Sequence, residues 1–187
     1  MTSQIIVEKQ KLENPPLEIH YLGDRALRYP AKRIARVDDE TRKLIREMLQ
    51  TMYSADGIGL AAPQVGVHKQ LIVIDCEPDT ATTPPLILIN PTIKKFSKDI
   101  SPFQEGCLSI PGVYMDVVRP EVVEVSYKDE TGRPRSLKAT ELLSRAIQHE
   151  MDHLTGVLFV DRVENQLALN EELVKHKFSP KAVKPVK

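Results

Sequence analysis

The sequence predicts an α+β fold in which antiparallel β-sheets pack around a central helix, with a further helix near the C-terminus. Three observations predict it. Residues 71–138 hold short β-rich runs separated by Pro, Gly and Asp turns, and residues 140–154 carry apolar side chains at helical spacing. The length of 187 residues suits one domain with a substantial core. The expected central helix also carries the pattern His-Glu-x-x-His, at residues 149–153.

Composition places the chain among ordinary soluble proteins and limits its partners. Apolar residues make up 41% and charged residues 28%, and 26 basic side chains balance 26 acidic ones. No global field would therefore hold the protein on DNA or on an anionic membrane. No apolar stretch approaches the ~18 residues of a membrane span, and the polar N-terminus is unlike a signal or transit peptide. We expect a cytoplasmic protein with two free thiols, Cys76 and Cys107.

The N-terminal third is expected to hold a polar extension, one amphipathic helix and a shaped loop. Residues 1–17 are polar and interrupted by two prolines, so this extension should lie on the surface or stay loose, before a single domain over residues 18–170. Apolar residues recur at helical spacing over residues 37–53, and Asp38 is a suitable N-cap. The sequence GIGLAAPQVG, at residues 57–66, is too rich in glycine for a long regular element and favours a loop.

The middle and end of the chain are expected to alternate strands with two helices. Thr140 is expected to cap a helix that runs to about residue 154 and stops at Gly156. A weaker helix is expected over residues 162–176. It overlaps a basic tail at residues 171–187. Residues 129–132 form a plausible hairpin turn. The expected strands are residues 71–76, 86–89, 92–96, 113–118, 121–127 and 135–138.

The pattern His-Glu-x-x-His indicates a metal site. Residues i and i+4 of a helix lie on one face, so His149 and His153 can reach one ion. They share an arc with Glu150 and with the apolar residues Leu142, Leu143, Ala146, Ile147 and Leu154, whereas the opposite arc carries Glu141, Ser144, Arg145, Gln148 and Asp152. Imidazoles that face a core need a metal or hydrogen bonds. The alternative is a chance match of a short pattern.

The third metal ligand separates families of metal hydrolase. Zinc proteases of the ordinary kind use a downstream Glu, or a third His within HExxHxxGxxH, and here Phe159 occupies the place of that His. Upstream, the sequence EGCLS at residues 105–109 offers Cys107, which ends a short loop before the strand expected at residues 113–118.

Three motifs in this order resemble those of the peptide deformylase family: GIGLAAPQ at residues 57–64, EGCLS at residues 105–109 and QHEMDH at residues 148–153. The resemblance covers residues 19–165, and the segment around Gly112 with the N-terminal extension is closer to cyanobacterial and plastid forms. It implies a hydrolase that removes the formyl group from the starting methionine of newly made proteins.

The resemblance also implies a role for each motif residue. Cys107, His149 and His153 would bind one metal ion and leave an open coordination position. Glu150 would act as general base and then acid for the water that attacks the formyl carbon. The side-chain amide of Gln64 and the backbone N–H of Leu108 would stabilise the oxyanion.

Substrate contacts follow from the same resemblance. Gly57 and Gly59 would let the loop backbone approach an extended peptide that binds like an added strand. Arg119 would pair with Glu105 and fix the cysteine loop. Tyr114 stands where many bacterial relatives carry an arginine. The residues expected to contact substrate are Ile58, Gly59, Gly112, Leu142 and Ala146, with Glu105 and Tyr114 near the rim of the methionine pocket.

The metal and some partners stay open at this point. The resemblance favours Fe(II) as the native ion, and Zn(II), Ni(II) or Co(II) also suit one thiolate and two imidazoles. The basic tail is either simply solvated or in contact with ribosomal RNA. Two rival functions are an endopeptidase with the same ligands and a catalytically silent family member that binds nascent chains or ribosomes.

Overall fold

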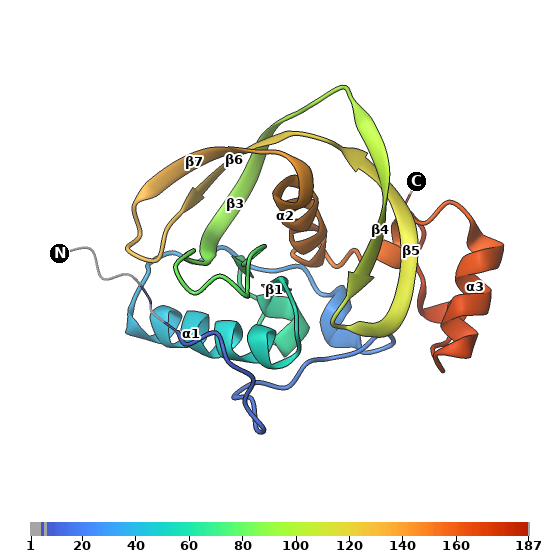
Figure 1. Ribbon diagram of the computed structural model, residues 1–187, viewed down its shortest axis with the longest axis horizontal. Coiled ribbons are helices and arrows are strands. Elements are labelled where there is room, and N and C mark those ends of the chain that lie inside the picture. Colours follow the sequence, from blue (N-terminus) through green and yellow to red (C-terminus); the bar gives the residue numbers. More distant parts are fainter. Residues whose placement is uncertain (1–4, 6, 187) are drawn as a thin grey trace.

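A computed structural model describes residue 5 and residues 7–186 and confirms the α+β class (Figure 1). Residues 1–4 and 6 of the expected extension and Lys187 of the tail lie outside the described residues. The helices are α1 (Asp39–Ser54), α2 (Glu141–His153) and α3 (Gln166–Lys175). The strands are β1 (Gly59–Ala61), β2 (Leu71–Ile74), β3 (Leu86–Phe96), β4 (Ile100–Cys107), β5 (Ile110–Pro120), β6 (Val123–Lys128) and β7 (Pro134–Ala139).

Two antiparallel sheets enclose α2. The larger has the order β1-β2-β3-β6-β7, and the smaller is the pair β4-β5. Figure 1 shows α2 between the two sheets, α1 below the larger one and α3 outside the smaller one. This arrangement places α2, with its His-Glu-x-x-His pattern, at the centre of the molecule.

Residues 86–96 form one strand where two were expected. The interruption lies at Asn90, which has a left-handed φ of 51° and coincides with a register shift against β6. Its side-chain amide donates to the carbonyl of Ile34 and accepts from the Ile34 N–H, both at 2.8 Å. These two side-chain bonds hold Asn90 in place, and β3 resumes its pairing with β6 at Thr92, so the strand continues through a local break.

The strand β4 was not expected, because its sequence ISPFQEGC lacks alternating apolar residues and contains a proline. It forms by pairing with β5, from Ile100 opposite Pro120 to Glu105 opposite Met115. Cys107 therefore lies at the end of a strand and not in a loop. A register shift between Glu105 and Cys107 turns the cysteine out of the regular ladder.

The helix α1 and the N-terminal extension pack together. The Asp38 side chain caps α1 by accepting from the Thr41 N–H at 2.9 Å, as the sequence predicts. The described part of the extension is held and not loose: Lys9 Nζ lies 2.6 Å from the buried Asp75 carboxylate and donates to three backbone carbonyls. Farther along, the Leu17 N–H donates to the Thr51 hydroxyl of α1.

The helix α2 is buried on nearly all sides, which corrects the division into an apolar and a polar arc. Ser144, Arg145, Gln148 and Asp152, on the arc opposite the motif, are all buried. Leu142, expected inside, is 40% exposed. The reason is that the β4-β5 sheet covers the polar arc and supplies its hydrogen-bond partners.

The C-terminal helix is shorter than expected, because it covers Gln166–Lys175 and not residues 162–176. A 3₁₀ turn covers Phe159–Arg162, and α3 begins only after Asn165, whose side chain caps it at the Ala168 N–H. The tail then returns along the domain, where the Lys184 N–H donates to Asp161. Within the described part of the chain, none of the helices combines the length and apolarity needed to cross a membrane.

Candidate metal centre

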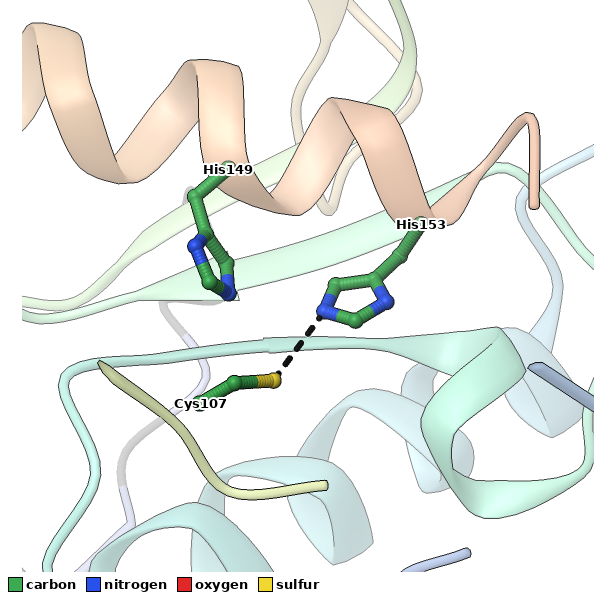
Figure 2. A group of neighbouring side chains, drawn as sticks. All are labelled: Cys107, His149 and His153. Carbon is green, nitrogen blue, oxygen red and sulfur yellow. Dashed lines mark hydrogen bonds between the residues drawn. The ribbon is translucent and has the colours of Figure 1, made fainter. Parts of the chain in front are cut away.

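Three donor side chains meet where β4 ends against α2. Cys107 comes from β4, and His149 and His153 come from successive turns of α2 (Figure 2). One donor atom from each lies within 4.8 Å of the others, and Cys107 Sγ is 3.4 Å from His153 Nε2. A thiolate and two imidazoles at this spacing form a donor set suited to one transition-metal ion, so the residues present fit a metal.

A carboxylate orients the first histidine. His149 Nδ1 is 3.0 Å from Glu105 Oε2, which leaves Nε2 available for a ligand. Burial alone would raise the pKa of Glu105, but its hydrogen bonds with His149 and Arg119 outweigh burial and hold that pKa well below its usual range. Glu105 is therefore an anion beneath the site, buried and not at the rim where we expected it.

Arginines fix that carboxylate. Arg119 donates to both Glu105 oxygens, at 2.6 and 2.9 Å, and to Asp152 at 2.8 Å. Arg145 donates to Glu105 at 3.0 Å. Arg162 also binds Asp152, at 2.6 and 2.7 Å. The sequence motifs predict the pair of Arg119 with Glu105 but not the contacts of Arg145 and Asp152. The signal available for Asp152 was its place inside QHEMDH, whereas no local pattern singles out Arg145.

Glu150 lies beside the donors with one oxygen free. Its Oε2 is buried and has no hydrogen-bond partner among the described residues, and burial raises its pKa to about 7. A Cβ on Gly59 would come within 2.5 Å of Glu150 Oε1. Glycine at position 59 therefore lets the β1 backbone lie directly against this carboxylate.

Gln64 is oriented towards the cysteine. Its side-chain oxygen accepts from the Ala61 N–H at 2.8 Å, so its Nε2 donates on the other side, 3.1 Å from Ser109 Oγ and 3.5 Å from Cys107 Sγ. Ser109 was not predicted as a site residue, although it belongs to the EGCLS motif. The amide of Gln64 is therefore a fixed donor at the centre.

A cleft of about 520 Å³ opens over the donors. Tyr114 stands at its rim, 58% exposed, and its ring lies against Gly106. Phe103, Tyr21 and Ile19 also line it and were not predicted. The predicted residues that line it are Gly57, Ile58, Gly59, Glu105, Cys107, Leu108, Gly112, Tyr114, Leu142, Ala146, His149 and Glu150. Arg119 does not line the cleft and lies behind Glu105.

Known proteins share both this sequence and this fold. A sequence model described as polypeptide deformylase matches residues 16–168. Peptide deformylase 1 of Nostoc sp. is 75% identical and the peptide deformylase of Synechocystis sp. is 65% identical, each over 100% of both chains.

The solved structures agree. A crystal structure of a peptide deformylase from Synechococcus elongatus in complex with actinonin has a TM-score of 0.96 at 68% identity, covering 97% of this chain and 99% of that one. A plant peptide deformylase has a TM-score of 0.82 at 42% identity, covering 89% and 91%. The resemblance to cyanobacterial forms is thus confirmed, and by sequence and fold together this chain belongs to the polypeptide deformylase family of enzymes.

Proposed function

We propose that this chain removes the N-formyl group from the amino-terminal methionine of newly synthesised peptides, with water as the second substrate and formate as a product. One observation carries the proposal: the donors of Cys107, His149 and His153 lie within 4.8 Å of one another, and Cys107 and His149 line one cleft together with Glu150. Family membership supplies the reaction class, and the geometry supplies groups that can perform it.

The metal is proposed to be one divalent ion per chain held by these three side chains. Three protein donors leave a position for water or substrate, which is the arrangement of hydrolytic sites. When bound, the ion would lower the pKa of a water molecule and polarise the formyl oxygen. We propose Fe(II) as the native ion, and the donor set also accepts Zn(II), Ni(II) or Co(II).

Glu150 is proposed to move the proton. Glu150 lines the same cleft as Cys107 and His149 and has an oxygen without a hydrogen-bond partner among the described residues, so it can take a proton from the attacking water and pass it to the departing amine. The oxyanion is proposed to be met by the Gln64 amide, which its bond from Ala61 holds in place, and by the backbone N–H of Leu108, the residue that follows Cys107.

The methionine side chain is proposed to lie against Ile58, Leu142, Ala146 and the His149 ring, which line one cleft. Gly57 lets the Leu108 side chain pack directly against the loop, because a Cβ there would come within 2.5 Å of it, and the loop backbone on the cleft side is proposed to bind the substrate backbone. Gly112 and Tyr114 would contact the substrate from the β4-β5 side. Glu105 and Arg119 would act by positioning His149 rather than by touching the substrate.

The test compares formyl-Met-Ala-Ser with acetyl-Met-Ala-Ser, on protein loaded with Fe(II) under anaerobic conditions or with Ni(II). We expect release of formate from the first peptide and little turnover of the second. Equal turnover of both, or cleavage at internal bonds, would favour the endopeptidase alternative. A protein that binds the formyl peptide without turnover would be the silent family member.

A contact with the ribosome through the tail is proposed as a second property. It is favoured by the exposure of Lys175, Lys177, Lys181 and Lys184 on a tail whose backbone is held against Asp161. Replacing these four lysines with glutamine should reduce co-sedimentation with ribosomes at low salt. Unchanged co-sedimentation would exclude the tail from that contact.

A further inference from the structure

The N-terminal extension inserts the side chain of Lys9 into the loop that joins β2 to β3. Lys9 Nζ lies 2.6 Å from Asp75 Oδ2. It also donates to three backbone carbonyls of the loop, those of Thr83, Thr80 and Glu77, at 2.7, 2.8 and 3.2 Å. The Lys9 side chain is only 10% exposed and that of Asp75 only 1%. Four oxygen atoms therefore surround one charged nitrogen that is almost withdrawn from water.

The loop has hydrogen bonds of its own that bring these oxygens together. The three carbonyls are three positions apart in sequence. The Thr80 N–H donates to the Glu77 carbonyl at 3.0 Å, and the Thr83 N–H donates to the Thr80 carbonyl at 3.2 Å. The Thr83 hydroxyl donates to the Glu77 carboxylate at 2.7 Å. Two successive turns thus present their carbonyls to the same point, and the arrangement does not depend on Lys9 alone.

This set of oxygens is suited to an ammonium group. An ammonium group has three N–H donors and no acceptor, so it can satisfy several converging carbonyls at once. Its charge is balanced by Asp75, which also accepts from the Tyr53 hydroxyl at 2.7 Å and from the Glu77 N–H at 3.0 Å. Without the cation, Asp75 would be a buried anion with only neutral donors, which is a costly state.

The loop is joined directly to the cleft over the metal centre. The Asp75 N–H donates to the Ile58 carbonyl at 2.8 Å. The residue before Asp75, Ile74, pairs with Gly59 of β1. Ile58 and Gly59 both line the cleft. The position of Asp75 is therefore transmitted through one hydrogen bond to the loop that is proposed to contact the methionine.

We propose that residues 75–83 form a cage for one ammonium group, that Lys9 fills this cage, and that the filled cage positions Ile58 for the substrate. The effect on the substrate rests on the proposed function, whereas the cage does not. Lys9 lies outside the lining of the cleft and acts through Asp75, so it is a positioning residue and not a catalytic one.

The first experiment replaces Lys9 in the metal-loaded full chain. Lys9→Met keeps an apolar stem and removes every donor, so the melting temperature should fall by about 5–10 °C. Well below that temperature, KM for formyl-Met-Ala-Ser should rise by about fivefold with kcat within about twofold, because a contact made through Ile58 binds ground and transition states alike. A lower melting temperature with unchanged KM would refute the positioning role.

Lys11→Met is the matched control. Lys11 lies two positions farther along the extension and pairs with Asp56, but the two side chains are 62% and 73% exposed. An exposed ion pair contributes little, so both the melting temperature and KM should stay close to those of the wild type. Equal effects in the Lys9 and Lys11 variants would show that loss of charge from the extension, and not the cage, is responsible.

The second experiment refills the cage. Lys9→Ala removes the stem as well and leaves room for a small cation. About 0.1 M methylammonium should restore part of the melting temperature and lower KM towards the wild-type value. Tetramethylammonium at the same concentration has the same charge but no N–H donor, so it should do neither. The wild type should respond equally to both salts. An equal response of Lys9→Ala to the two salts would refute the cage.

Calorimetry with acetyl-Met-Ala-Ser separates this proposal from the proposed function. The dissociation constant should rise in Lys9→Met by the same factor as KM, and methylammonium should lower it in Lys9→Ala, with or without turnover. Absence of turnover in the wild type with these changes retained would refute the deformylase activity alone. Turnover with the same KM and the same dissociation constant in the wild type and in Lys9→Met would refute the positioning role alone.

Discussion

The two sides of the molecule are held together by different forces. On one side, α1 packs on the five-stranded sheet through apolar side chains, with Ile45, Met48, Leu49 and Met52 fully buried. On the other side, α2 meets the β4-β5 sheet through Glu105, Arg119, Arg145 and Asp152, which are also buried. The donors of the metal centre lie on this second, charged side.

This difference shows what each kind of contact contributes. Apolar burial is non-directional, so it stabilises a fold without fixing any one atom closely. A bidentate ion pair has one geometry, and the pair of Arg119 with Glu105 transmits that geometry to the His149 ring. Buried ion pairs add little net stability compared with apolar packing. We therefore infer that the charged side holds the side chains of the metal centre in position, whereas the apolar side stabilises the fold.

The largest effect is expected where the charged side meets the substrate. Glu150→Gln keeps the shape of the side chain and removes its ability to take a proton, so kcat should fall by about 10²–10⁴-fold. Metal content and melting temperature should stay close to those of the wild type, because Glu150 is not among the donors. Metal analysis and formate release measure the two properties. A variant that keeps full turnover would contradict the role of Glu150.

Arg119→Ala tests the ion network itself. Removing Arg119 leaves Glu105 and Asp152 with fewer partners in a buried place, so unfolding free energy should fall by about 3–5 kcal/mol. Metal affinity should also fall, by roughly 10–100-fold, because His149 loses its support. The control Arg162→Gln removes a more exposed partner of Asp152 and should cost less. Denaturant unfolding and metal competition provide the measurements. Unchanged metal affinity in Arg119→Ala would show that the ion pairs around Glu105 do not support metal binding.

Local patterns in the sequence predicted the apolar side better than the charged side. The periodicity of residues 37–53 and the Asp38 cap predicted α1 to within two residues of its observed start, because helix signals are short-range. The strand β4 was missed, since it exists through its pairing with β5 and not through its own alternation. The β4-β5 sheet covers Arg145 and Asp152. Because β4 was not predicted, the burial of these two residues was not predicted either.

The site was predicted in its motifs and not in their surroundings. Cys107, His149 and His153 lie in short patterns whose chemistry is readable, and the structure brings their donors together. Arg145 donates to Glu105 across 40 positions of sequence, and the contact depends on how α2 sits under the β4-β5 sheet. No spacing rule connects two such residues. Phe103 in the cleft was missed for the same reason.

Met48→Ala tests the apolar side. The variant creates a cavity under the larger sheet, so unfolding free energy should fall by about 2–5 kcal/mol. Well below the melting temperature, kcat/KM and metal affinity should barely change, because no ion pair of the centre involves α1. Met48→Leu conserves volume and should cost less than about 1.5 kcal/mol. A large loss of metal affinity in the folded Met48→Ala variant would show that the two sides are not separable.

Asp129 gives the smallest expected effect and tests a charged contact that belongs to the larger sheet and not to the centre. Its carboxylate accepts from Thr131 and Arg133 in the β6-β7 turn and pairs with Arg135 at 2.7 Å. Burial would raise its pKa, but these bonds outweigh burial and lower the pKa from 3.8 to about 2.

A carboxyl group with a lowered pKa stabilises the fold above its ordinary pKa and loses that contribution as it is protonated. Wild type should therefore exceed Asp129→Asn in unfolding free energy by about 1 kcal/mol at neutral pH, and the difference should shrink between pH 4 and pH 2. Because Glu105 titrates equally in both proteins, its contribution cancels in the difference. A gap that is constant from pH 7 to about pH 2 would show that the turn is held by shape and not by charge.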